Sequence, residues 1–455
     1  MTFDPNERQA MTAAANEAAS QTVDLDGPRC GPRLRERIAE EIRREGPIPF
    51  SRYMELCLYE PELGYYSRPR EQFGKAGDFY TSSDVHAVFG RLLARQFEEM
   101  WRALELPKRL DLIELGAGRG LFARDVLDWS IRQFPDFATK LHYTVVEQSA
   151  HLRERLHERL AEHIAAGRAT VFDSMEAAAS AAGENVIVFG NEFFDALPVE
   201  VVDHRGSVRV GVENGKFGES FVASSAAENE FLDRYSIHPE EGERVEVPLA
   251  SLEWMERIAG IFSPLSPAGC STQVAPPHAA KGRRDAVPGA TLTRDDSESL
   301  RTAMRSKRGF VVLIDYGYTR EEQLAGRHRD TLMTYRRHRA SASPYEAPGE
   351  QDITAHVNFT ALRARGVELG LEALALVTQS QLLIGIGEDT QFADAFQDCK
   401  LPQERAKVAL QLKHLVTPGG MGETFQALVM SHAIPREKAA GLSGLKFARQ
   451  GAENH

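Results

Sequence analysis

The stretch from Arg109 to Gly120, RLDLIELGAGRG, constrains the fold more than any other part of the chain. Its apolar residues predict a short buried strand that ends in glycines at every second position, Gly116, Gly118 and Gly120. Glycine tolerates positive φ and lets the backbone approach a ligand closely. The next residues, LFARDVLDWSIRQF, have helical spacing, so the loop opens onto a helix N-terminus with free N–H groups. The stretch therefore predicts a nucleotide-type cofactor site.

The order of these glycines distinguishes two classes of cofactor. A dinucleotide fingerprint has the order G-x-G-x-x-G, with a pyrophosphate at the helix end, whereas this chain has E-x-G-x-G-x-G. Glu114 would place a carboxylate beside the cofactor, which repels a pyrophosphate but suits the ammonium group of S-adenosylmethionine. The pattern favours a methyl donor and disfavours an NAD-dependent dehydrogenase. The alternative without a ligand is a strand, a loop and an ordinary glutamate.

Acidic residues after the next two strands complete the predicted cofactor site. LHYTVVEQS supplies Glu147, which would hold the ribose hydroxyls, and it lies 147 − 114 = 33 residues after Glu114. A separation of about 20 residues is usual, so we expect a longer connection through RQFPDFATK. A short strand near 169–172 leads into Asp173 and Ser174, where folds of this kind usually read the adenine amino group. The alternative for that pair is an exposed turn.

The second informative stretch is NVIVFGNEFFDALPVEVVD, a continuously apolar strand followed by polar groups. In open α/β sheets, ligands bind at the carboxyl ends of the strands. Asn191, Glu192 and Asp195, with Phe193 and Phe194, therefore lie where a methyl acceptor would bind. A carboxylate can orient a guanidinium and aromatic faces can shield its charge. The alternative is that Asn191 and Asp195 cap a helix.

The composition limits the class of partner. The 455 residues are 42% hydrophobic and 26% charged, as in ordinary soluble domains, and the first thirty resemble neither a signal nor a transit peptide. The net charge of −12 disfavours nucleic-acid binding and favours a basic or peptide partner. Four scattered cysteines, Cys30, Cys57, Cys270 and Cys399, predict no metal site and no disulfide scaffold. We expect a cytoplasmic protein without membrane insertion.

Other segments carry weaker predictions. The segment SRYMELCLYEPELGYYSRPREQFGKAGDFYTSSDVHAVFG is rich in aromatic residues and predicts a lid or wall over the cofactor pocket, or else a packed cap. LIDYGY predicts a strand that ends at Asp315-Tyr316-Gly317 on the ligand edge, and TQSQLLIGIG is a further strand candidate. We expect a polar loop with Tyr335, His338, Asp352 and His356, in which a structural role for the histidines is favoured. His151, His157 and His163 are expected on the solvent side of a helix.

Several long motifs together resemble one known family. In chain order they are GPIPFSRYMELCLYEPELGYY, GKAGDFYTSSDVHAVFG, LIELGAGRG, VVEQS, GNEFFDALPVEVV, LIDYGY and DITAHVNF. They resemble the MidA-like family of S-adenosylmethionine-dependent methyltransferases, and the resemblance covers about residues 32 to 430. That family includes the mitochondrial protein arginine methyltransferase required for assembly of respiratory complex I. The chain departs from the family at Ala117, where proline is common, and at Asp84, where glutamate is common.

The resemblance implies a fold, a cofactor and a set of site residues. It implies an α/β class I methyltransferase fold with a Rossmann-like sheet. The residues themselves add an N-terminal helical and loop cap and, past Pro198, a β-rich insertion. By motif position, Gly116, Gly118, Glu147 and Asp173 would bind S-adenosyl-L-methionine, with Asn191, Glu192 and Asp195 near the acceptor. Gly77, Asp78 and Thr81 would close over the site.

These observations together predict the organisation of the chain. We expect a disordered tail (1–31), an N-terminal cap and lid (32–108), a cofactor-binding core (109–198), a β-rich insertion (199–250), a core helix (251–262), a flexible insertion (263–299), the C-terminal half of the core (300–432) and a tail (433–455).

The predicted function is methyl transfer to a protein arginine, on a complex I subunit or its bacterial counterpart. Two alternatives remain open. A methyltransferase for a small molecule would have a deep enclosed pocket in place of an open acidic groove. The second alternative is an assembly factor that binds the cofactor and its protein partner without catalysis.

Overall fold

The central sheet places the ends of its parallel strands together. This computed structural model describes residues 30–68, 87–262, 306–324, 330–336, 339–341 and 343–448. In spatial order, the main strands are β15 (Glu372–Thr378), β16 (Phe425–His432), β10 (Arg308–Tyr318), β5 (Asn185–Asn191), β2 (Leu110–Leu115), β3 (Leu141–Val146) and β4 (Ala169–Phe172), and β14 (Val357–Asn358) pairs with the end of β10. Neighbours from β10 to β4 are parallel, whereas β16 is antiparallel to both β10 and β15. The predicted α/β class with a Rossmann-like sheet is confirmed.

The strand order identifies where a ligand would bind. From β2 the chain continues to β3 and β4 on one side, then returns to β5 on the other side of β2. Ligands in open α/β sheets bind at such a reversal, beyond the carboxyl ends of the strands. The glycine loop follows β2, so it lies at this point.

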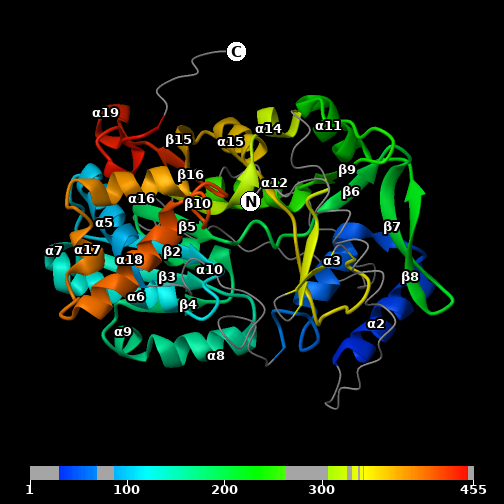
Figure 1. Cartoon of the computed structure of the whole chain (residues 1–455), viewed down its shortest axis with the longest axis horizontal. Coiled ribbons are helices and arrows are strands. Elements are labelled where there is room, and N and C mark those ends of the chain that lie inside the picture. Colours follow the sequence, from blue (N-terminus) through cyan, green and yellow to red (C-terminus); the bar gives the residue numbers. More distant parts are fainter. Residues whose placement is uncertain are drawn as a thin grey trace, which may run out of the picture.

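Helices cover both faces of the sheet, as Figure 1 shows. One face carries α5 (Ala87–Ala103), α6 (Leu121–Gln133), α7 (Pro135–Ala138), α16 (Gln379–Glu388), α17 (Ala393–Phe396) and α18 (Pro402–Val416), and side chains of α8 (Ala150–Arg159) join the same core. The other face carries α10 (Met175–Ala181), α12 (Leu249–Phe262) and α15 (Phe359–Glu368). Phe122 of α6 stacks on Phe189 of β5 with 4.5 Å between ring centroids. The sheet is therefore buried on both sides, which explains its continuously apolar strands.

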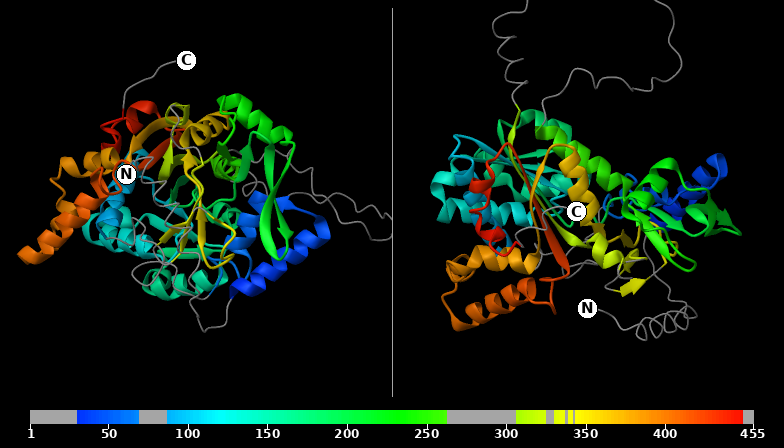
Figure 2. Two further views of the ribbon diagram at one scale, coloured as in Figure 1. Left: turned by 45° about the vertical axis from the view of Figure 1, so that its right-hand side comes forward. Right: turned by 90° about the horizontal axis from the view of Figure 1, so that it is seen from above.

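A second core joins the first helices to the predicted β-rich insertion. Its sheet has the order β1-β7-β6-β9, with β8 beside β7; the elements are β1 (Ile48–Pro49), β6 (Glu200–Asp203), β7 (Gly206–Glu213), β8 (Lys216–Val222) and β9 (Arg244–Val247). The helices α2 (Cys30–Glu45) and α3 (Phe50–Tyr59) pack against it, and α11 (Ala226–Tyr235) lies beside β9. Figure 2 shows the first helices beside these strands in both views. This unit forms one wall of the pocket described below.

Two sequence predictions of secondary structure were wrong. TQSQLLIGIG forms α16 and not a strand, because Thr378 and Gln381 build a capping box: Thr378 Oγ1 accepts the Gln381 N–H at 3.2 Å and Gln381 Oε1 accepts the Thr378 N–H at 3.0 Å. The expected polar loop contains a three-stranded sheet of order β12-β11-β13, made by β11 (Met333–Arg336), β12 (Arg339–Ser341) and β13 (Asp352–Thr354). β11 and β12 pair within a few residues, Arg336 with Arg339, and β13 joins them from some 20 residues further along the chain, Met333 with Thr354. His338 lies outside the described residues.

One predicted solvent-side histidine is buried. His163 is only 5% exposed, and its Nε2 lies 3.0 Å from Asp128 Oδ1. The predicted single helix is broken at Leu160 between α8 and α9 (Ala161–Ala165), so the regular spacing of that sequence does not set the orientation of His163. His157 is exposed as expected, and His151 lines the pocket at its edge.

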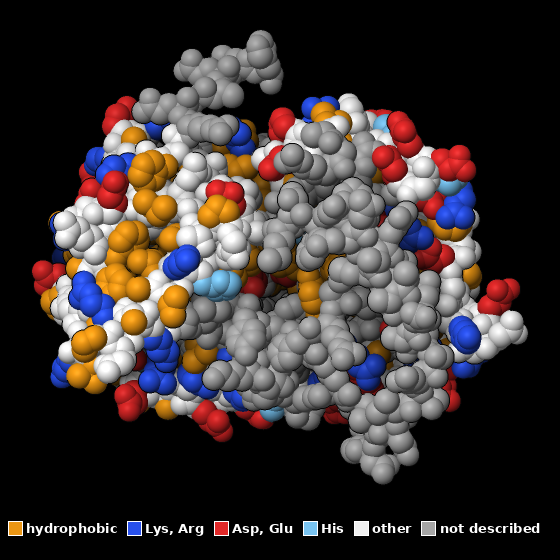
Figure 3. Space-filling view, in the orientation of Figure 1, with side chains coloured by type: hydrophobic (Ala, Val, Ile, Leu, Met, Phe, Trp, Pro, Cys, Tyr) orange, Lys and Arg blue, Asp and Glu red, His pale blue; other side chains and the backbone are white. Residues whose placement is uncertain are grey.

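Three short helices complete the described part of the chain: α14 (Arg320–Leu324) follows β10, whereas α19 (Arg436–Ala439) and η2 (Ser443–Leu445) follow β16. Ser443 is fixed to α5, since its backbone N–H donates to Glu99 Oε2 at 2.9 Å. On the face seen in Figure 3, hydrophobic side chains gather over α16 and α18. The side chains of Leu401 and Leu410 next to or in α18 are more than half exposed. The predicted tail up to residue 29 and the predicted insertion 263–299 lie outside the described residues.

Candidate active site

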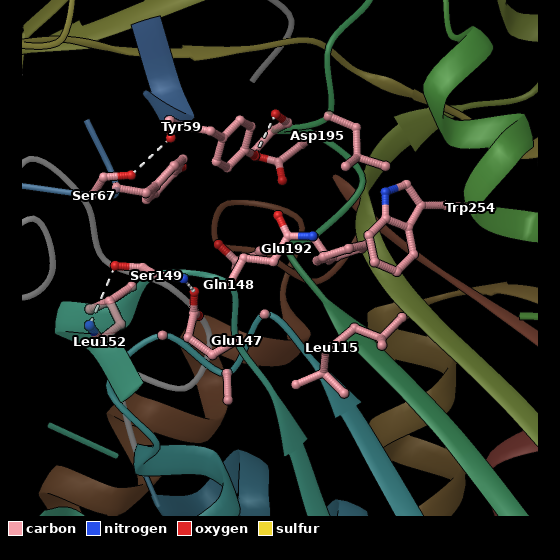
Figure 4. A pocket seen from close by; sticks show the side chains of 18 of the residues that line it. Tyr59, Ser67, Leu115, Glu147, Gln148, Ser149, Leu152, Glu192, Asp195 and Trp254 are labelled. Carbon is pink, nitrogen blue, oxygen red and sulfur yellow. Dashed lines mark hydrogen bonds between the residues drawn. The ribbon is translucent and has the colours of Figure 1, made fainter. Parts of the chain in front are cut away.

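A cavity of about 1060 Å³ lies beyond the carboxyl ends of β2, β3, β5 and β10. Residues from α3, α8 and α12 complete its walls. In Figure 4, Glu147 lies on one side of the cavity and Asp195 and Trp254 on the other, with Glu192 between them. The two groups of residues predicted for cofactor and acceptor therefore face one space.

The glycine loop forms the floor of this cavity. Gly116 and Gly118 line it, with φ of 64° and 52°, which other residues adopt only with strain. A Cβ at Gly116 would lie 2.8 Å from Phe193 Cδ2, so the loop is in direct contact with residues 191–195, which we call the acceptor segment after their predicted role. Gly120 was also predicted to bind the cofactor, but it is not among the described residues that line the cavity. Instead it precedes α6 with φ of 70°, where a Cβ would lie 2.6 Å from Leu156 Cδ2.

Glu114 lies at the base of the cavity, near the end of β2. Its side chain is buried and Oε2 accepts a hydrogen bond of 2.8 Å from the Tyr143 hydroxyl. Burial raises the pKa of Glu114 to about 8, while the Tyr143 hydrogen bond acts in the opposite direction. A cationic ligand beside Glu114 would favour its ionised form.

Glu147 directly follows β3 and also faces the cavity. Its Oε1 accepts the backbone N–H of Ser149 at 2.8 Å, and the N–H groups of Gln148 and Gly118 also favour its ionised form. Burial is the larger effect and raises the pKa of Glu147 to about 7. These N–H groups fix the carboxylate next to the glycine loop.

The other residues predicted to bind the cofactor do not lie with Glu114, Glu147 and the glycine loop in the described cavity wall. Asp173 is exposed and Ser174 precedes α10, and neither is among the described residues that line the cavity. The strand β4 is at the edge of the sheet, which places its end away from the reversal between β2 and β5. Gly77, Asp78 and Thr81 lie outside the described residues.

The three predicted acceptor-side residues line the cavity together. Asn191 Nδ2 donates to Glu192 Oε1 at 3.1 Å, and Asp195 accepts a hydrogen bond of 2.7 Å from the Tyr316 hydroxyl. Glu192 has a φ of 51°, an uncommon conformation for a residue with a side chain. Within the described chain, no helix begins between Asn191 and β6, so the alternative that Asn191 and Asp195 cap a helix is wrong.

Two buried oxygens in this group lack a hydrogen-bond donor among the described residues. They are Asn191 Oδ1 and Asp195 Oδ1. Leaving a buried acceptor without a donor is unfavourable, and such atoms are rare in folded proteins. Burial raises the pKa of Asp195 to about 6, so its carboxylate is mostly ionised at neutral pH. Both residues line the cavity, so these oxygens belong to its wall.

Aromatic residues that the sequence did not assign to the acceptor side form part of the walls. Tyr59 and Tyr66 stack with 5.7 Å between ring centroids, and the Tyr66 hydroxyl donates to Asp352 Oδ2 at 2.9 Å. Trp254 of α12 packs edge-on against Phe193 at 4.8 Å. The aromatic-rich segment predicted a wall, and Tyr59 and Tyr66 line the cavity, but nothing in the helical pattern of α12 distinguished Trp254.

Acidic side chains outnumber basic ones in the described cavity wall. The carboxylates are Glu55, Glu62, Glu114, Glu147, Glu154, Glu192, Asp195, Glu200, Glu253 and Asp352, and the arginines are Arg52, Arg119 and Arg257. A cleft lined mainly by one sign of charge concentrates ligands of the opposite sign. The site therefore suits positively charged ligands and disfavours a pyrophosphate.

A family model for S-adenosyl-L-methionine-dependent methyltransferases matches residues 92–377, more than half of the chain. The chain belongs to this family. The predicted resemblance to MidA-like methyltransferases is confirmed, and the protein is an enzyme that uses S-adenosyl-L-methionine.

Similar proteins extend this assignment over most of the chain. The mitochondrial protein arginine methyltransferase NDUFAF7 homolog of Drosophila melanogaster is 27% identical over 415 residues, covering 87% of this chain and 84% of that protein. The human protein arginine methyltransferase NDUFAF7 is 26% identical over 444 residues, covering 96% and 90%. A protein from Burkholderia thailandensis, crystallised bound to S-adenosyl-homocysteine, has a TM-score of 0.72 and 26% identity and covers 94% of this chain and 98% of that chain. The methyltransferase fold is therefore shared over nearly the whole length.

The residues of this methyltransferase fit its cofactor. S-adenosyl-L-methionine carries a sulfonium, an ammonium group and ribose hydroxyls, and the cavity offers buried carboxylates beside a wall of bare glycine backbone. The described residues contain no group of three or more His, Cys, Asp or Glu side chains that could hold a metal ion. None of the helices in the described ranges has both the length and the apolar character of a membrane span.

Proposed function

We propose that this methyltransferase modifies an arginine side chain of a protein. The observation that carries the proposal is a pair of buried oxygens in an acidic cavity, Asn191 Oδ1 and Asp195 Oδ1, for which the described residues supply no hydrogen-bond donor. A guanidinium is planar, permanently charged and rich in N–H donors, so it can satisfy both oxygens. The relatives in fly and human that are named protein arginine methyltransferases support the same acceptor.

The cofactor side of the proposal assigns separate tasks to two glutamates. Glu147 accepts hydrogen bonds from the two ribose hydroxyls, and Glu114 lies beside the ammonium group. Gly116 and Gly118 allow the cofactor to lie directly on the backbone. When bound, S-adenosyl-L-methionine supplies an activated methyl group on its sulfonium. These are charge-assisted contacts, which are stronger than neutral hydrogen bonds.

On the acceptor side, Asp195 and Asn191 orient the guanidinium and Glu192 adds a second negative charge. Orientation is the main contribution, because placing one nitrogen in line with the methyl group removes most of the entropic barrier. The nitrogen that gains the methyl group loses one proton, and the Asp195 carboxylate receives it. Tyr59, Tyr66 and Trp254 shield the cation with their aromatic faces.

The target protein and the compartment belong to the same proposal. The resemblance to the arginine methyltransferase required for complex I assembly makes a complex I subunit, or its bacterial counterpart, the expected substrate. The scattered cysteines favour a reducing compartment, for which the cytoplasm is our expectation, while the compared relatives are named mitochondrial.

Two measurements on the purified protein test the proposal. Calorimetric titration with S-adenosyl-L-methionine, S-adenosyl-homocysteine and NAD should give binding of the first two only. Peptides that contain one arginine, one lysine or one monomethylarginine are then incubated with the enzyme and the methyl donor, and products are read by mass spectrometry. Transfer to lysine alone, or to free small molecules alone, would contradict an arginine acceptor. Cofactor binding without transfer to any protein of a cell extract would favour the assembly factor without catalysis.

A further inference from the structure

Asp315, at the carboxyl end of β10, collects three consecutive backbone N–H groups from the acceptor segment. Its Oδ2 accepts hydrogen bonds from the N–H groups of Phe193 at 3.1 Å, Phe194 at 2.9 Å and Asp195 at 3.2 Å. Its Oδ1 accepts the N–H of Tyr316 at 2.9 Å. Asp315 is 1% exposed and is not among the described residues that line the cavity. Asp315 therefore contacts the backbone of the acceptor segment without lining the cavity itself.

The acceptor segment depends on this carboxylate. The positive φ of Glu192 turns the chain at the end of β5, and the Glu192 N–H donates to the Ile314 carbonyl at 2.9 Å. The next three N–H groups then point to one side, with no helix to satisfy them. A buried N–H group without an acceptor is energetically unfavourable. If the Asp315 oxygens are removed, we therefore expect the backbone of the acceptor segment to take a different path.

Tyr316 holds the same segment through a side chain. Its hydroxyl donates to Asp195 Oδ2 at 2.7 Å, while its ring packs against Phe425 at 5.6 Å and His356 at 5.3 Å. One oxygen of Asp195 is thereby fixed, while the described residues supply no hydrogen-bond donor to the other, Oδ1. Two adjacent residues of one strand thus fix both the backbone and the carboxylate of the acceptor segment.

We propose that Asp315 and Tyr316 are positioning residues for methyl transfer: they set the direction of the Asp195 carboxylate and leave the cofactor half of the cavity unchanged. The inference rests on the proposed function in one respect, since it takes Asp195 as the group that binds the acceptor. It explains why an Asp-Tyr dipeptide lies among the last residues of β10 although only Tyr316 lines the cavity.

Two substitutions with matched controls separate positioning from a general role in the fold. In Asp315→Asn, one oxygen becomes an NH₂ group that cannot accept N–H groups, whichever way the amide is turned. Glu246→Gln is its control, because Glu246 is also buried and accepts the N–H groups of Thr331 at 2.9 Å and Leu332 at 3.3 Å. Tyr316→Phe removes one hydroxyl. Tyr318→Phe on the same strand is its control, because the buried Tyr318 hydroxyl accepts a hydrogen bond of 3.1 Å from Gln323.

The expected result is a selective loss of turnover. Both test variants should lower kcat by about a hundredfold, since small misplacement of reacting groups has effects of that size. The Kd for S-adenosyl-homocysteine should stay within about twofold, and KM for the acceptor should change much less than kcat. Both control variants should keep wild-type kcat. Unchanged kcat in Tyr316→Phe, or equal losses in a test variant and its control, would overturn the proposal.

A readout that needs no acceptor keeps this inference separate from the choice of substrate. Amide hydrogen exchange of the peptide that spans 190–197 should accelerate in Asp315→Asn and remain slow in Glu246→Gln. If wild-type enzyme methylates lysine and not arginine, the proposed function fails, yet the same kcat ratios measured on lysine still test the positioning residues. Asp315→Ala removes both oxygens, so slow exchange in both Asp315→Asn and Asp315→Ala would overturn the inference whatever the acceptor. If Asp315→Asn does not fold, Tyr316→Phe alone decides.

Discussion

Tyr143 donates a hydrogen bond of 2.8 Å to Glu114 across two neighbouring parallel strands, below the cofactor half of the cavity. The phenol supports the ionised carboxylate, but burial dominates and raises the pKa of Glu114 to about 8. Burial likewise raises the pKa of Glu147 to about 7. Both groups therefore hold protons at slightly acidic pH in the absence of ligand.

The first prediction is that cofactor affinity falls as the pH is lowered from 8 to 6. A bound cation favours the ionised forms of Glu114 and Glu147, so below their raised pKa values binding must release protons. For each group, Kd should then rise by up to about tenfold per pH unit. Calorimetry with S-adenosyl-homocysteine in buffers of different ionisation enthalpy measures both Kd and the protons released. Glu114→Gln should show a shallower dependence, and Tyr143→Phe should move the midpoint to higher pH. A wild-type affinity that does not depend on pH would contradict the assignment of Glu114.

The second prediction separates the two halves of the cavity. Glu147→Ala removes the acceptor of two ribose hydroxyls, so cofactor binding should weaken by at least about a hundredfold, given about 1.5–3 kcal/mol for each hydrogen bond to a charged group. Glu192→Ala should retain binding and lose transfer. Glu158→Ala, at an exposed position on α8, is the control for loss of one carboxylate. Full transfer activity in Glu192→Ala would move the acceptor site elsewhere.

The third prediction concerns the contact between Gly116 and Phe193. Gly116→Ala adds a Cβ 2.8 Å from Phe193 Cδ2 at a φ of 64°, so it combines backbone strain with displacement of the acceptor segment. Gly215→Ala has comparable strain, with φ of 74°, but no atom lies within 4 Å of its Cβ. Each substitution should cost about 1 kcal/mol of stability through strain. Only Gly116→Ala should also lose cofactor binding, as titration calorimetry would show; equal Kd values in the two variants would exclude a role of this contact.

The fourth prediction follows from the raised pKa of Asp195, about 6. If Asp195 binds the guanidinium as a carboxylate, kcat/KM for the acceptor should be constant above pH 7 and decline below pH 6 as the group is protonated. The rate should be measured with saturating cofactor, so that Glu114 and Glu147 do not contribute. Asp195→Asn should be slow at every pH and lose this decline. The same decline in Asp195→Asn would assign it to another group.

Local patterns predicted the features that depend on neighbouring residues in the chain. The strand and glycines from Leu110 to Gly120, the carboxylate at Glu147 and the polar group after β5 each follow from a short stretch of sequence, because strand ends in a parallel sheet meet at one edge. The roles given to Asn191, Glu192 and Asp195 remain predictions, although the structure places all three in one cavity.

The features that the sequence did not predict depend on contacts between distant residues. The Tyr66 hydroxyl bonds Asp352, 286 residues later in the chain, and no periodicity encodes such a pair. His163 is buried because the helix breaks at Leu160, which the regular leucine spacing concealed. Gly120 satisfied a cofactor motif yet lies against Leu156, since the same left-handed turn is needed to start α6.

The pairing of β1 with β7 has a consequence for the way the protein is made. Ile48 pairs with Val210 and Pro49 with Arg209, so the apolar face of α2 and α3 finds its sheet only after residues some 160 positions later have left the ribosome. Contacts of such long range form slowly and leave nascent chains exposed to aggregation in the meantime. The first helices that the structure describes are therefore among the last to be protected, and chaperone binding during synthesis should concentrate on residues 34–58.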